Sequence, residues 1–493
     1  MKTDVIVIGA GFAGLSAAIS LADKGYEVIV LEKNKVAGGR ARYYQEAGFT
    51  FDMGPSWYWM PDVFERFFNK FGKKTSDYYQ LKRLDPSYRV YFGKDDFLDV
   101  PAKLEAMFKM FDELEPGSSK KLKEFLAQSE YKYQVGINDL VYKPSRSLTE
   151  FLDPKLLFDM LHMDIFQSFA GHIRKYFKND KLLRLIEFPI LFLGATPENT
   201  PALYSLMNYA DISLGTWYPE GGMHKIIEGM LALAKEKGVK VLTDQEVKHV
   251  EIEQKNIKKV NTLKDTFEAD IVVAGADYHH IDQQILPEGY RNYTPSYWDK
   301  RVMAPSSLLF YLGVDKKLKN LLHHNLFFDR DFGPHAKEIY ETPMWPSDPL
   351  FYVSLTSKTD PTVAPEGYEN VFLLMPVAPG LEDNEELREK YYDIIMNRLE
   401  VVTGQSIKEH VIYKRSYAHK DFIKDYHAFK GNAYGLANTL MQTAILKPGL
   451  KNKKLNNLYY TGQLTVPGPG VPPSLISGMV VADEVAKEFK LAK

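Results

Sequence analysis

The chain has 493 residues, which is enough for two or three domains around a substantial core. Its formal net charge of −2 gives no reason to expect a nucleic acid partner, and the absence of cysteine excludes disulfides, thiolate metal sites and cysteine nucleophiles. No metal site is expected. No apolar run approaches the ~18 residues of a spanning helix, and the first strand begins too early to leave room for a signal peptide. We therefore expect a cytoplasmic protein whose contact with the cell membrane is peripheral.

Residues 3–33 carry the clearest pattern in the chain. The apolar run at 5–8 predicts a buried parallel strand, residues 15–24 predict a helix, and residues 27–31 predict a second strand. Between the first strand and the helix, three glycines follow with the spacing G-x-G-x-x-G. A bare motif of this kind is weak evidence, but here strand, glycines, helix, strand and a final acid occur in order. The segment therefore predicts a dinucleotide-binding βαβ unit.

Each residue of this motif has a physical role. Gly9 permits the tight turn, Gly11 lets a pyrophosphate approach the backbone, and Gly14 lets the helix pack closely on the strand. The helix N-terminus adds free N–H groups and a partial positive charge. Glu32, at the end of the second strand, is placed to accept hydrogen bonds from ribose hydroxyls.

The next segment continues the cofactor pattern. Gly38 and Gly39 would let the backbone pass close to a cofactor, and either Arg40 or Arg42 could face its diphosphate. The run FDMGPS follows at 51–56. A continuation of this kind favours FAD over NAD, because a flavin extends beyond the βαβ unit into the rest of the fold.

A dense group of aromatic residues occupies 57–68. It begins with Trp57, Tyr58 and Trp59, and it is either ordinary core or the wall of an apolar substrate channel. The stretch 188–218, which contains Phe192, is a second candidate for this lining.

Residues 78–193 separate these segments from the next cofactor pattern. Two strands are expected within 78–97, and the region from 101 to 193 is mostly helical. Between Arg174 and Arg184 basic residues alternate with apolar ones. This mixture suits a helix that lies on an anionic bilayer, and equally an amphipathic helix that covers a core.

The middle of the chain returns to an α/β pattern. A helix at 224–237 is followed by a strand at 239–243, a three-stranded meander whose last strand is a short one at 266–268, and an apolar strand at 271–274. Residues 306–413 then mix strands with helix, which predicts the sheet of a second domain.

The C-terminus carries a second glycine-rich loop. A strand ends at Gly462, and the run 466–472, rich in proline and glycine, leads into a helix at 474–488. A loop that feeds a helix N-terminus can bind the ribityl chain, diphosphate or pyrimidine edge of a flavin. Gly462 and Val471 are the candidate contacts.

Segments at the start, middle and end of the chain together resemble one family. The most specific are GGRA at 38–41, FTFDMGPSWYWMP at 49–61, WYPEGGM at 217–223 and TGQLTVPGPGVPPSLISG at 461–478. On these motifs the sequence is similar to bacterial carotenoid desaturases of the phytoene desaturase type, within the FAD-containing amine oxidase superfamily. The likeness covers almost the whole chain.

The resemblance implies an α/β fold with two domains. A Rossmann-like FAD-binding domain of the glutathione reductase type would comprise residues 1–77, 215–282 and 430–493. A substrate-binding domain with a mixed sheet would comprise residues 78–214 and 283–429, with a helical, membrane-associating cap at about 101–193. No pattern specifies an oligomeric state.

The resemblance also implies a set of site residues. In the wider superfamily, a residue of the strand that matches 245–247 contacts adenine through its backbone, which points to Val247. The expected FAD contacts are Gly9, Gly11, Phe12, Ala13, Gly14, Glu32, Lys33, Gly38, Gly39, Arg40, Gly54, Pro55, Ser56, Val247, Gly462 and Val471. The expected lining of the substrate tunnel is Trp57, Tyr58, Trp59 and Phe192.

The implied reaction is desaturation of a C40 polyene, a hydrophobic carotenoid that would arrive from the membrane. The flavin N5 takes a hydride from an allylic carbon, the neighbouring carbon loses a proton, and conjugation delocalises the developing cation. The protein would then act mainly by positioning. No catalytic residue is carried over, and His162, Asp164, His172, Glu187 and Glu198 are expected to be structural or solvated rather than acid–base groups.

Three activities are compatible with this sequence. The sequence favours the first, which is desaturation of phytoene or its partly desaturated products. The second is 3,4-desaturation of a hydroxycarotenoid late in biosynthesis, which would use the same motifs. The third, from another class, is an FAD amine oxidase or a non-catalytic flavoprotein, and the proline-rich C-terminal run argues against it.

Overall fold

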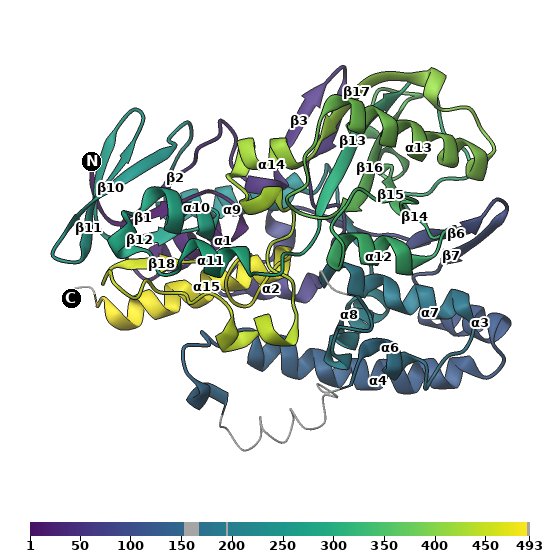
Figure 1. Ribbon diagram of the computed structural model, residues 1–493, viewed down its shortest axis with the longest axis horizontal. Helices are drawn as coiled ribbons and strands as arrows, with labels where there is room; N and C mark the ends of the chain where they lie inside the picture. Colours follow the sequence, from purple (N-terminus) through teal and green to yellow (C-terminus); the bar gives the residue numbers. More distant parts are fainter. Residues whose placement is uncertain (152–166, 194–195, 491–493) are drawn as a thin grey trace.

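The computed structural model describes residues 1–151, 167–193 and 196–490. Within these residues the chain forms two seven-stranded sheets, with helices around the first and a helical cap beside the second (Figure 1). The expected α/β class, with a Rossmann-like domain and a mixed-sheet domain, is confirmed. The residue boundaries expected for the two domains stay predictions. None of the helices in this described part of the chain is both long and apolar enough to span a bilayer.

The first sheet is built on the predicted βαβ unit. In spatial order its strands are β10 (Val247–Glu253), β11 (Asn256–Thr262), β12 (Thr266–Ala274), β1 (Lys2–Ile8), β2 (Val28–Leu31) and β9 (Lys240–Leu242), with β18 (Leu458–Tyr460) paired to β12. The strands β18, β12, β1, β2 and β9 are parallel, whereas β10, β11 and β12 form an antiparallel meander. The central strands are apolar throughout because both faces of the sheet are covered.

Helices cover the two faces of this sheet. They are α1 (Phe12–Asp23), α2 (Pro61–Asn69), α9 (His224–Glu236), α10 (Tyr278–His280), α11 (Pro295–Asp299) and α15 (Val471–Glu488). The helices α1 and α15 pack very closely, since a Cβ on Gly478 would lie 2.4 Å from the carbonyl oxygen of Ala13. Ser16 also donates a 2.6 Å hydrogen bond to the carbonyl of Leu475. The C-terminal helix is thereby held against the helix that follows the glycine motif.

The second sheet has seven strands in mixed directions. Their spatial order is β17 (Val411–Tyr417), β13 (Ser306–Val314), β16 (Glu369–Val377), β15 (Phe351–Ser354), β14 (His324–Phe327), β6 (Tyr88–Gly93) and β7 (Asp96–Val100). Only the pair β14 and β6 is parallel among these neighbours. The long helix α13 (Glu385–Thr403) packs on one face. The other face, which carries Leu309 and Leu374, belongs to the core shared with the first domain.

Shorter elements connect the two sheets and form the cap. Two small antiparallel pairs are β3 (Tyr43–Glu46) with β4 (Phe49–Asp52), and β5 (Leu81–Arg83) with β8 (Trp217–Pro219). The cap contains α3 (Leu104–Leu114), α4 (Ser118–Val135), α6 (Phe169–Ile173), α7 (Asp180–Glu187) and α8 (Leu206–Asn208), with the short helical turns η3 (Gly136–Leu140), η5 (Phe188–Leu193) and η7 (Tyr209–Leu214). Helix α14 (His419–Tyr426) lies between the two sheets, and α12 (Phe332–Tyr340) lies between the second sheet and the cap helices (Figure 1).

Some element boundaries differ from the expected ones. The short third strand of the meander and the apolar strand at 271–274 are one strand, β12, whose exposed and buried residues alternate at first and are all buried later. Helix α15 begins at Val471, three residues earlier than expected, because proline is accommodated in the first turn of a helix, where N–H groups have no partner within the helix.

Candidate functional site

The glycine motif places the turn between β1 and α1 against a second glycine pair. Gly9 has φ +99°, and a Cβ on Gly14 would lie 2.0 Å from the carbonyl oxygen of Gly9. A Cβ on Gly39 would lie 3.2 Å from the Cα of Gly11. The two loops therefore meet backbone to backbone, as they must if a ligand is to approach both.

These loops line one end of a cavity of about 800 Å³. The expected cofactor contacts that line it are Gly9, Gly11, Phe12, Ala13, Glu32, Lys33, Gly38, Gly39, Arg40, Gly54, Pro55, Ser56, Val247, Gly462 and Val471. Gly14 lies behind the turn, where its packing on Gly9 requires it. Segments from the start, middle and end of the chain thus meet at one wall.

Glu32 brings a carboxylate to this end of the cavity. Its side chain is buried, with Oε2 accepting a hydrogen bond from the N–H of Ala10 at 2.8 Å and Oε1 accepting one from the N–H of Asn34 at 2.9 Å. These donors fix the orientation of the carboxylate. Because each carboxylate oxygen can accept more than one hydrogen bond, Glu32 can also accept bonds from ligand hydroxyls.

Arg40 and Arg42 have different surroundings. Arg40 lines the cavity, donates from Nη2 to the carbonyl of Asn432 at 3.1 Å, and has a buried Nε without a hydrogen-bond partner among the described residues. Burial lowers the pKa of Arg40, and the charge of Asp277 opposes this shift. Arg42 forms a 2.7 Å ion pair with Asp425 instead. Of the two arginines, Arg40 is therefore the one that faces the cavity.

Two further segments, which the sequence patterns did not indicate, complete this end of the cavity. Asp277, which follows β12, accepts a hydrogen bond from the N–H of His280 at 3.1 Å, and burial raises the pKa of Asp277 to about 6. From α14 come Tyr426 and the adjacent His427, whose ring stacks on His280 at 3.8 Å and 7°. The signal for Asp277 was its place directly after an apolar parallel strand. The segment after α14 gave no signal, because it reaches the site from the second domain.

The other half of the cavity is apolar and aromatic. Trp57 and Trp59 line it with ring centroids 5.2 Å apart, and Phe188 lies 5.3 Å from Trp57. Leu309, Leu326 and Leu374, from the second sheet, line it as well. This half therefore offers contact surface rather than charge.

The other two residues expected to line the tunnel are Tyr58, which lies elsewhere, and Phe192, whose side chain is not described. Tyr58 points away from the cavity because neighbouring residues of an extended segment alternate sides. Its ring stacks on Phe64 at 4.5 Å and its hydroxyl lies 3.0 Å from that of Tyr79, so Tyr58 belongs to the core instead. The side chain of Phe192 lies outside the described part of the structure.

Three of the basic residues singled out for membrane contact are engaged within the protein. Arg174 forms a 2.9 Å ion pair with Glu187, and Lys181 pairs with Asp96. Arg184 donates a 2.9 Å hydrogen bond to the carbonyl of Phe328. This group therefore offers less free positive charge to a lipid surface than the sequence suggests.

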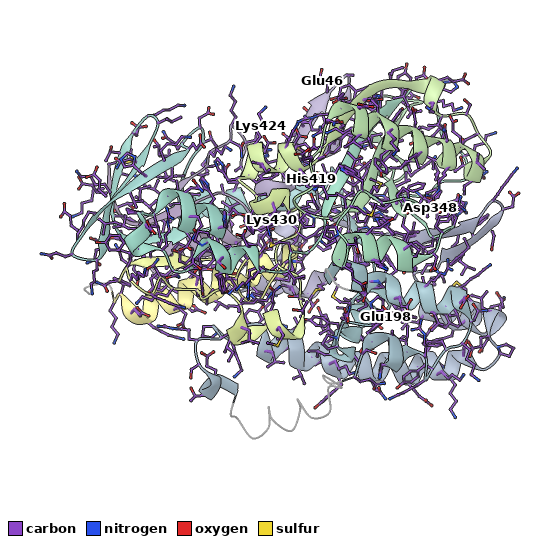
Figure 2. The ribbon with its side chains drawn as sticks, viewed as in Figure 1. Glu46, Glu198, Asp348, His419, Lys424 and Lys430 are labelled. Atoms are coloured by element: carbon purple, nitrogen blue, oxygen red, sulfur yellow. The ribbon has the colours of Figure 1, made fainter. Side chains whose placement is uncertain are left out.

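The five acid–base candidates divide into described and undescribed residues. His162 and Asp164 lie outside the described residues. His172 is buried beside Phe125 in the cap, and Glu198 is exposed at the surface of the cap (Figure 2). None of the three described candidates, His172, Glu187 and Glu198, lines the cavity as the structure describes it.

The polar end of the cavity fits FAD. The glycines leave room for a pyrophosphate beside the N-terminus of α1, Arg40 supplies a cation with an unused donor, and Glu32 supplies an acceptor for hydroxyls. The cavity then continues beyond the βαβ unit, which a flavin requires and a nicotinamide does not. When bound, FAD supplies a hydride acceptor.

Comparison with known proteins agrees with this geometry. The family described as flavin containing amine oxidoreductase matches residues 12–486. A carotenoid 3,4-desaturase of Haloarcula japonica is 41% identical over 487 residues, covering 99% of this chain and 98% of its own. A 4,4'-diapophytoene desaturase (4,4'-diaponeurosporene-forming) of Staphylococcus haemolyticus is 32% identical over 502 residues, covering 99% of this chain and all of its own.

A solved structure shows the same fold at low sequence identity. A double mutant of putrescine oxidase, from a redesign of cofactor binding, superposes with a TM-score of 0.62 at 13% identity, covering 99% of each chain. The family match and the two relatives each extend over nearly the whole sequence. The chain therefore belongs to the flavin-containing amine oxidoreductase family, and FAD is its cofactor.

Proposed function

We propose that this flavoenzyme is a carotenoid desaturase that introduces a 3,4 double bond into an acyclic C40 carotenoid with a hydroxylated end. The observation that carries this choice is the 41% identity to the Haloarcula japonica carotenoid 3,4-desaturase along both chains. The hydroxyls of Ser307 and Tyr434, which line the cavity, are compatible with an oxygen-bearing substrate.

A second candidate is earlier desaturation of phytoene or its partly desaturated products. It was the first choice from the sequence, and the 32% identity to a diapophytoene desaturase along the whole chain supports it. The higher identity to the 3,4-desaturase reverses the order of the two.

An amine oxidase is the least compatible with the cavity. A cationic amine needs an anionic or strongly polar partner when it is buried. Among the described lining residues, the carboxylates are Glu32, Glu246, Asp277 and Asp425, and all lie at the cofactor end. The aromatic half around Trp57 instead offers a polyene apolar contact along its length.

In this proposal the protein contributes positioning. The backbone at Gly11 and Gly39, with Arg40 and Glu32, holds the diphosphate and ribose of FAD. The polyene lies along Trp57, Trp59 and Phe188, and the apolar wall excludes water from the carbon that loses hydride. Conjugation spreads the positive charge that develops on the substrate, so the wall needs no carboxylate to stabilise it.

We also propose that the cavity opens toward a bilayer at the loop containing η14 (Leu440–Gln442) and η15 (Ala444–Leu446). Ile445 lines the cavity and is also exposed, while Met441 and Leu446 beside it are 74% and 44% exposed. Exposed apolar side chains at the rim of an apolar cavity suit insertion into lipid, the reservoir of an insoluble polyene. This loop replaces residues 174–184 as our proposed site of peripheral membrane contact.

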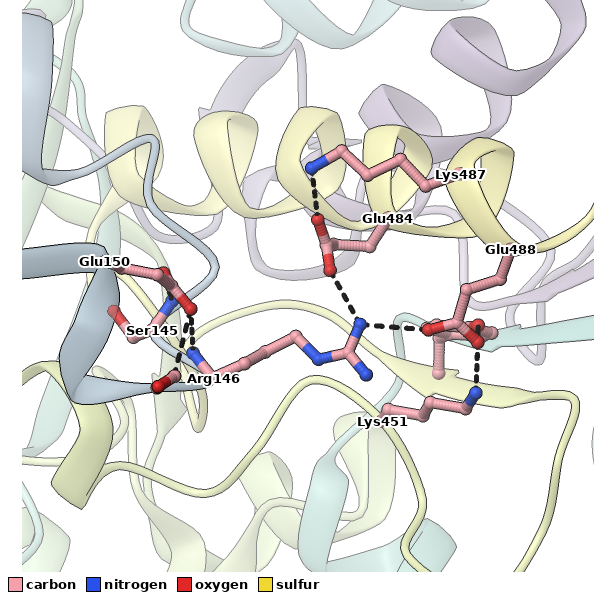
Figure 3. A network of polar contacts seen from close by, with 9 residues as sticks. Ser145, Arg146, Glu150, Lys451, Glu484, Lys487 and Glu488 are labelled. Carbon is pink, nitrogen blue, oxygen red and sulfur yellow. Dashed lines mark hydrogen bonds and ion pairs between the residues drawn. The ribbon is translucent and has the colours of Figure 1, made fainter.

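The cap contributes a second part of this rim, and it is firmly attached. Lys143 and Ser145 line the cavity, and the next residue, Arg146, pairs with Glu484 at 2.8 Å and Glu488 at 2.9 Å on α15 (Figure 3). Because α15 begins at the cofactor end, these ion pairs connect the rim with the FAD-binding domain.

Coexpression tests the choice between the two substrates. The chain is expressed in cells that accumulate phytoene, and separately in cells that accumulate a hydroxylated acyclic carotenoid, and the pigments are extracted. We expect the absorption to shift to longer wavelength in the second background and little change in the first. A shift only with phytoene would favour the second candidate, and no shift in either background would contradict carotenoid desaturation.

A further inference from the structure

A row of buried polar side chains begins at the wall of the cavity. Tyr352, on β15, lines the cavity, and its hydroxyl lies 2.6 Å from Nδ1 of His324, the first residue of β14. Trp57 covers the imidazole of His324, with ring centroids 4.1 Å apart and planes 12° from parallel. His324 is completely buried. An imidazole in this position lies directly behind the aromatic wall.

The row continues away from the cavity through the preceding residue. The rings of His323 and His324 lie 4.4 Å apart, and the Nε2 atoms of both lack a hydrogen-bond partner among the residues that the structure describes. Nδ1 of His323 lies 2.7 Å from Oγ1 of Thr359, which is partly exposed. The polar groups therefore extend from the cavity wall to the surface of the second domain.

The hydrogen bonds assign compatible tautomers along this row. When Tyr352 donates to Nδ1 of His324, the proton of the neutral His324 ring is on Nε2. When His323 donates from Nδ1 to Thr359, its Nε2 is an acceptor. A donor on one ring thus lies near an acceptor on the next, with the ring centroids 4.4 Å apart and no hydrogen bond formed between the two Nε2 atoms.

The reaction of the proposed function, on which this inference rests, releases a proton inside the cavity, and that proton must reach solvent. Each new double bond breaks two C–H bonds. One hydrogen leaves with its electron pair as a hydride, which the flavin accepts, and the other leaves as a proton while its electron pair becomes the π bond. Among the lining residues that the structure describes, the aromatic half of the cavity supplies no carboxylate to receive that proton.

We propose that Tyr352, His324 and His323 carry this proton from the cavity to the surface. The carbon gives its proton to the Tyr352 oxygen as the tyrosine hydroxyl proton moves to Nδ1 of His324. A small ring rotation brings the two Nε2 atoms into hydrogen-bond contact, and the Nε2 proton of His324 then passes to Nε2 of His323. The Nδ1 proton of His323 passes to Thr359 and then to solvent. Each group ends neutral, and rotation of the hydroxyls with exchange of the ring protons restores the starting state.

The electrostatic surroundings favour transfer over retention of the proton. Burial lowers the pKa of His323 to about 3 and lowers the pKa of His324 well below its usual range. Asp360 raises the pKa of His323 and Lys82 lowers it, and the neighbouring His323 lowers that of His324. Neither ring holds a positive charge near pH 7, so a proton that enters the row is passed on.

The experiment compares Tyr352→Phe and His324→Gln with the wild-type holoenzyme. His410→Gln is the control, since His410 contacts Asp315 outside this row. A hydroxylated acyclic carotenoid, or phytoene where coexpression selects it, is mixed with the enzyme without oxygen. Loss of flavin absorbance reports hydride transfer, and a pH-indicator dye in weak buffer reports release of the proton. The same measurements in deuterated water give the solvent isotope effect, and the shift of the carotenoid spectrum gives binding without turnover.

We expect proton release to slow at least about tenfold in both variants and to show an altered solvent isotope effect, while binding and FAD content stay unchanged. The control should match wild type. Proton release at the wild-type rate in both variants would overturn the proposal, and so would loss of carotenoid binding as the sole defect. Failure of the wild-type flavin to be reduced by either carotenoid would instead contradict the proposed function, so the two failures are distinguishable.

Discussion

The two halves of the cavity are built in different ways. At the cofactor half, backbone atoms of Gly9, Gly11 and Gly39 form the surface, and the buried charges of Arg40 and Glu32 complete it. At the aromatic half, side chains form the surface, and its geometry depends on how rings pack against one another. In our proposal, the first half binds a ligand with fixed charges and the second half aligns an uncharged chain.

The largest expected effect comes from changing the glycine motif. Gly11 has φ −82°, and a Cβ there would meet only the Cα of Gly39 at 3.9 Å, so Gly11→Val should fold. Its side chain would occupy the space of the pyrophosphate, and FAD affinity should fall by about 100-fold or more, which is about 2.7 kcal/mol. Flavin absorbance of the purified protein measures this.

Gly14→Val is the matched control for the fold. Its Cβ would lie 2.0 Å from the carbonyl oxygen of Gly9, so this variant should lose stability rather than only FAD. Thermal unfolding of the two proteins separates the effects. If Gly11→Val retained full flavin absorbance, our placement of the diphosphate would be wrong.

A second prediction concerns the buried hydrogen bonds that hold Trp59 in the aromatic half of the cavity. Trp59 donates to Oγ1 of Thr216 at 2.9 Å, Thr216 donates to Asp211 at 3.4 Å, and Tyr88 donates to Asp211 at 2.7 Å. Burial raises the pKa of Asp211 to about 7. An aspartate in the unfolded protein has a pKa of about 3.9, so protonated Asp211 stabilises the folded state fully below about pH 4. This stabilisation is lost as pH rises toward 7.

Asp211→Asn should therefore remove part of the pH dependence of unfolding. Between pH 5 and pH 8 the wild-type protein should lose about 2 kcal/mol more stability than the variant, because only the wild-type side chain must ionise while buried. Urea unfolding of both proteins at the two pH values measures this difference. Identical pH slopes would show that Asp211 does not titrate as its surroundings indicate.

A third prediction concerns the membrane contact proposed at Met441 and Ile445, where the aromatic half of the cavity would open. Met441→Asp and Ile445→Asp should each reduce sedimentation with vesicles of neutral lipid, with a partition coefficient at least about tenfold lower. Ile412→Asp, at a site 53% exposed on β17, is the control and should sediment like wild type. High salt should have little effect, since apolar insertion is not screened. Binding that high salt abolishes and that Met441→Asp leaves unchanged would locate the contact elsewhere.

The smallest expected effects are at the cap residues that sequence offers as acid–base groups. His172→Gln, Glu187→Gln and Glu198→Gln should each lower the single-turnover rate of flavin reduction by less than about tenfold, since none of them reaches the cavity. A loss of roughly 1,000-fold in one variant that still binds FAD and carotenoid would identify a catalytic acid or base in the cap.

The cofactor half was largely predictable from the sequence because its determinants are local. The order of strand, glycines, helix and Glu32 occurs within 32 residues, and each glycine has a backbone reason to be there. His280 and His427 could not be paired in this way, because residues 147 positions apart meet only when α14 lies over the first domain.

The aromatic half was predictable in composition but not in detail. Trp57 and Trp59 line the cavity as expected, whereas the alternation of an extended segment turns Tyr58 toward Tyr79. Tyr352 and His324 gave no sequence signal, because Tyr and His residues in an apolar strand are typical of ordinary core. Their proximity depends on the pairing of β14 with β15, which periodicity does not specify.

The central claim is that one cavity joins FAD to an apolar polyene, and anaerobic mixing tests it most directly. Purified holoenzyme is mixed with a hydroxylated acyclic carotenoid, with phytoene, and with a primary amine, each without oxygen, and the absorption spectrum is followed. We expect the flavin to bleach with one of the carotenoids while the polyene absorption moves to longer wavelength. A flavin that stays oxidised with both carotenoids and bleaches with the amine would contradict the account.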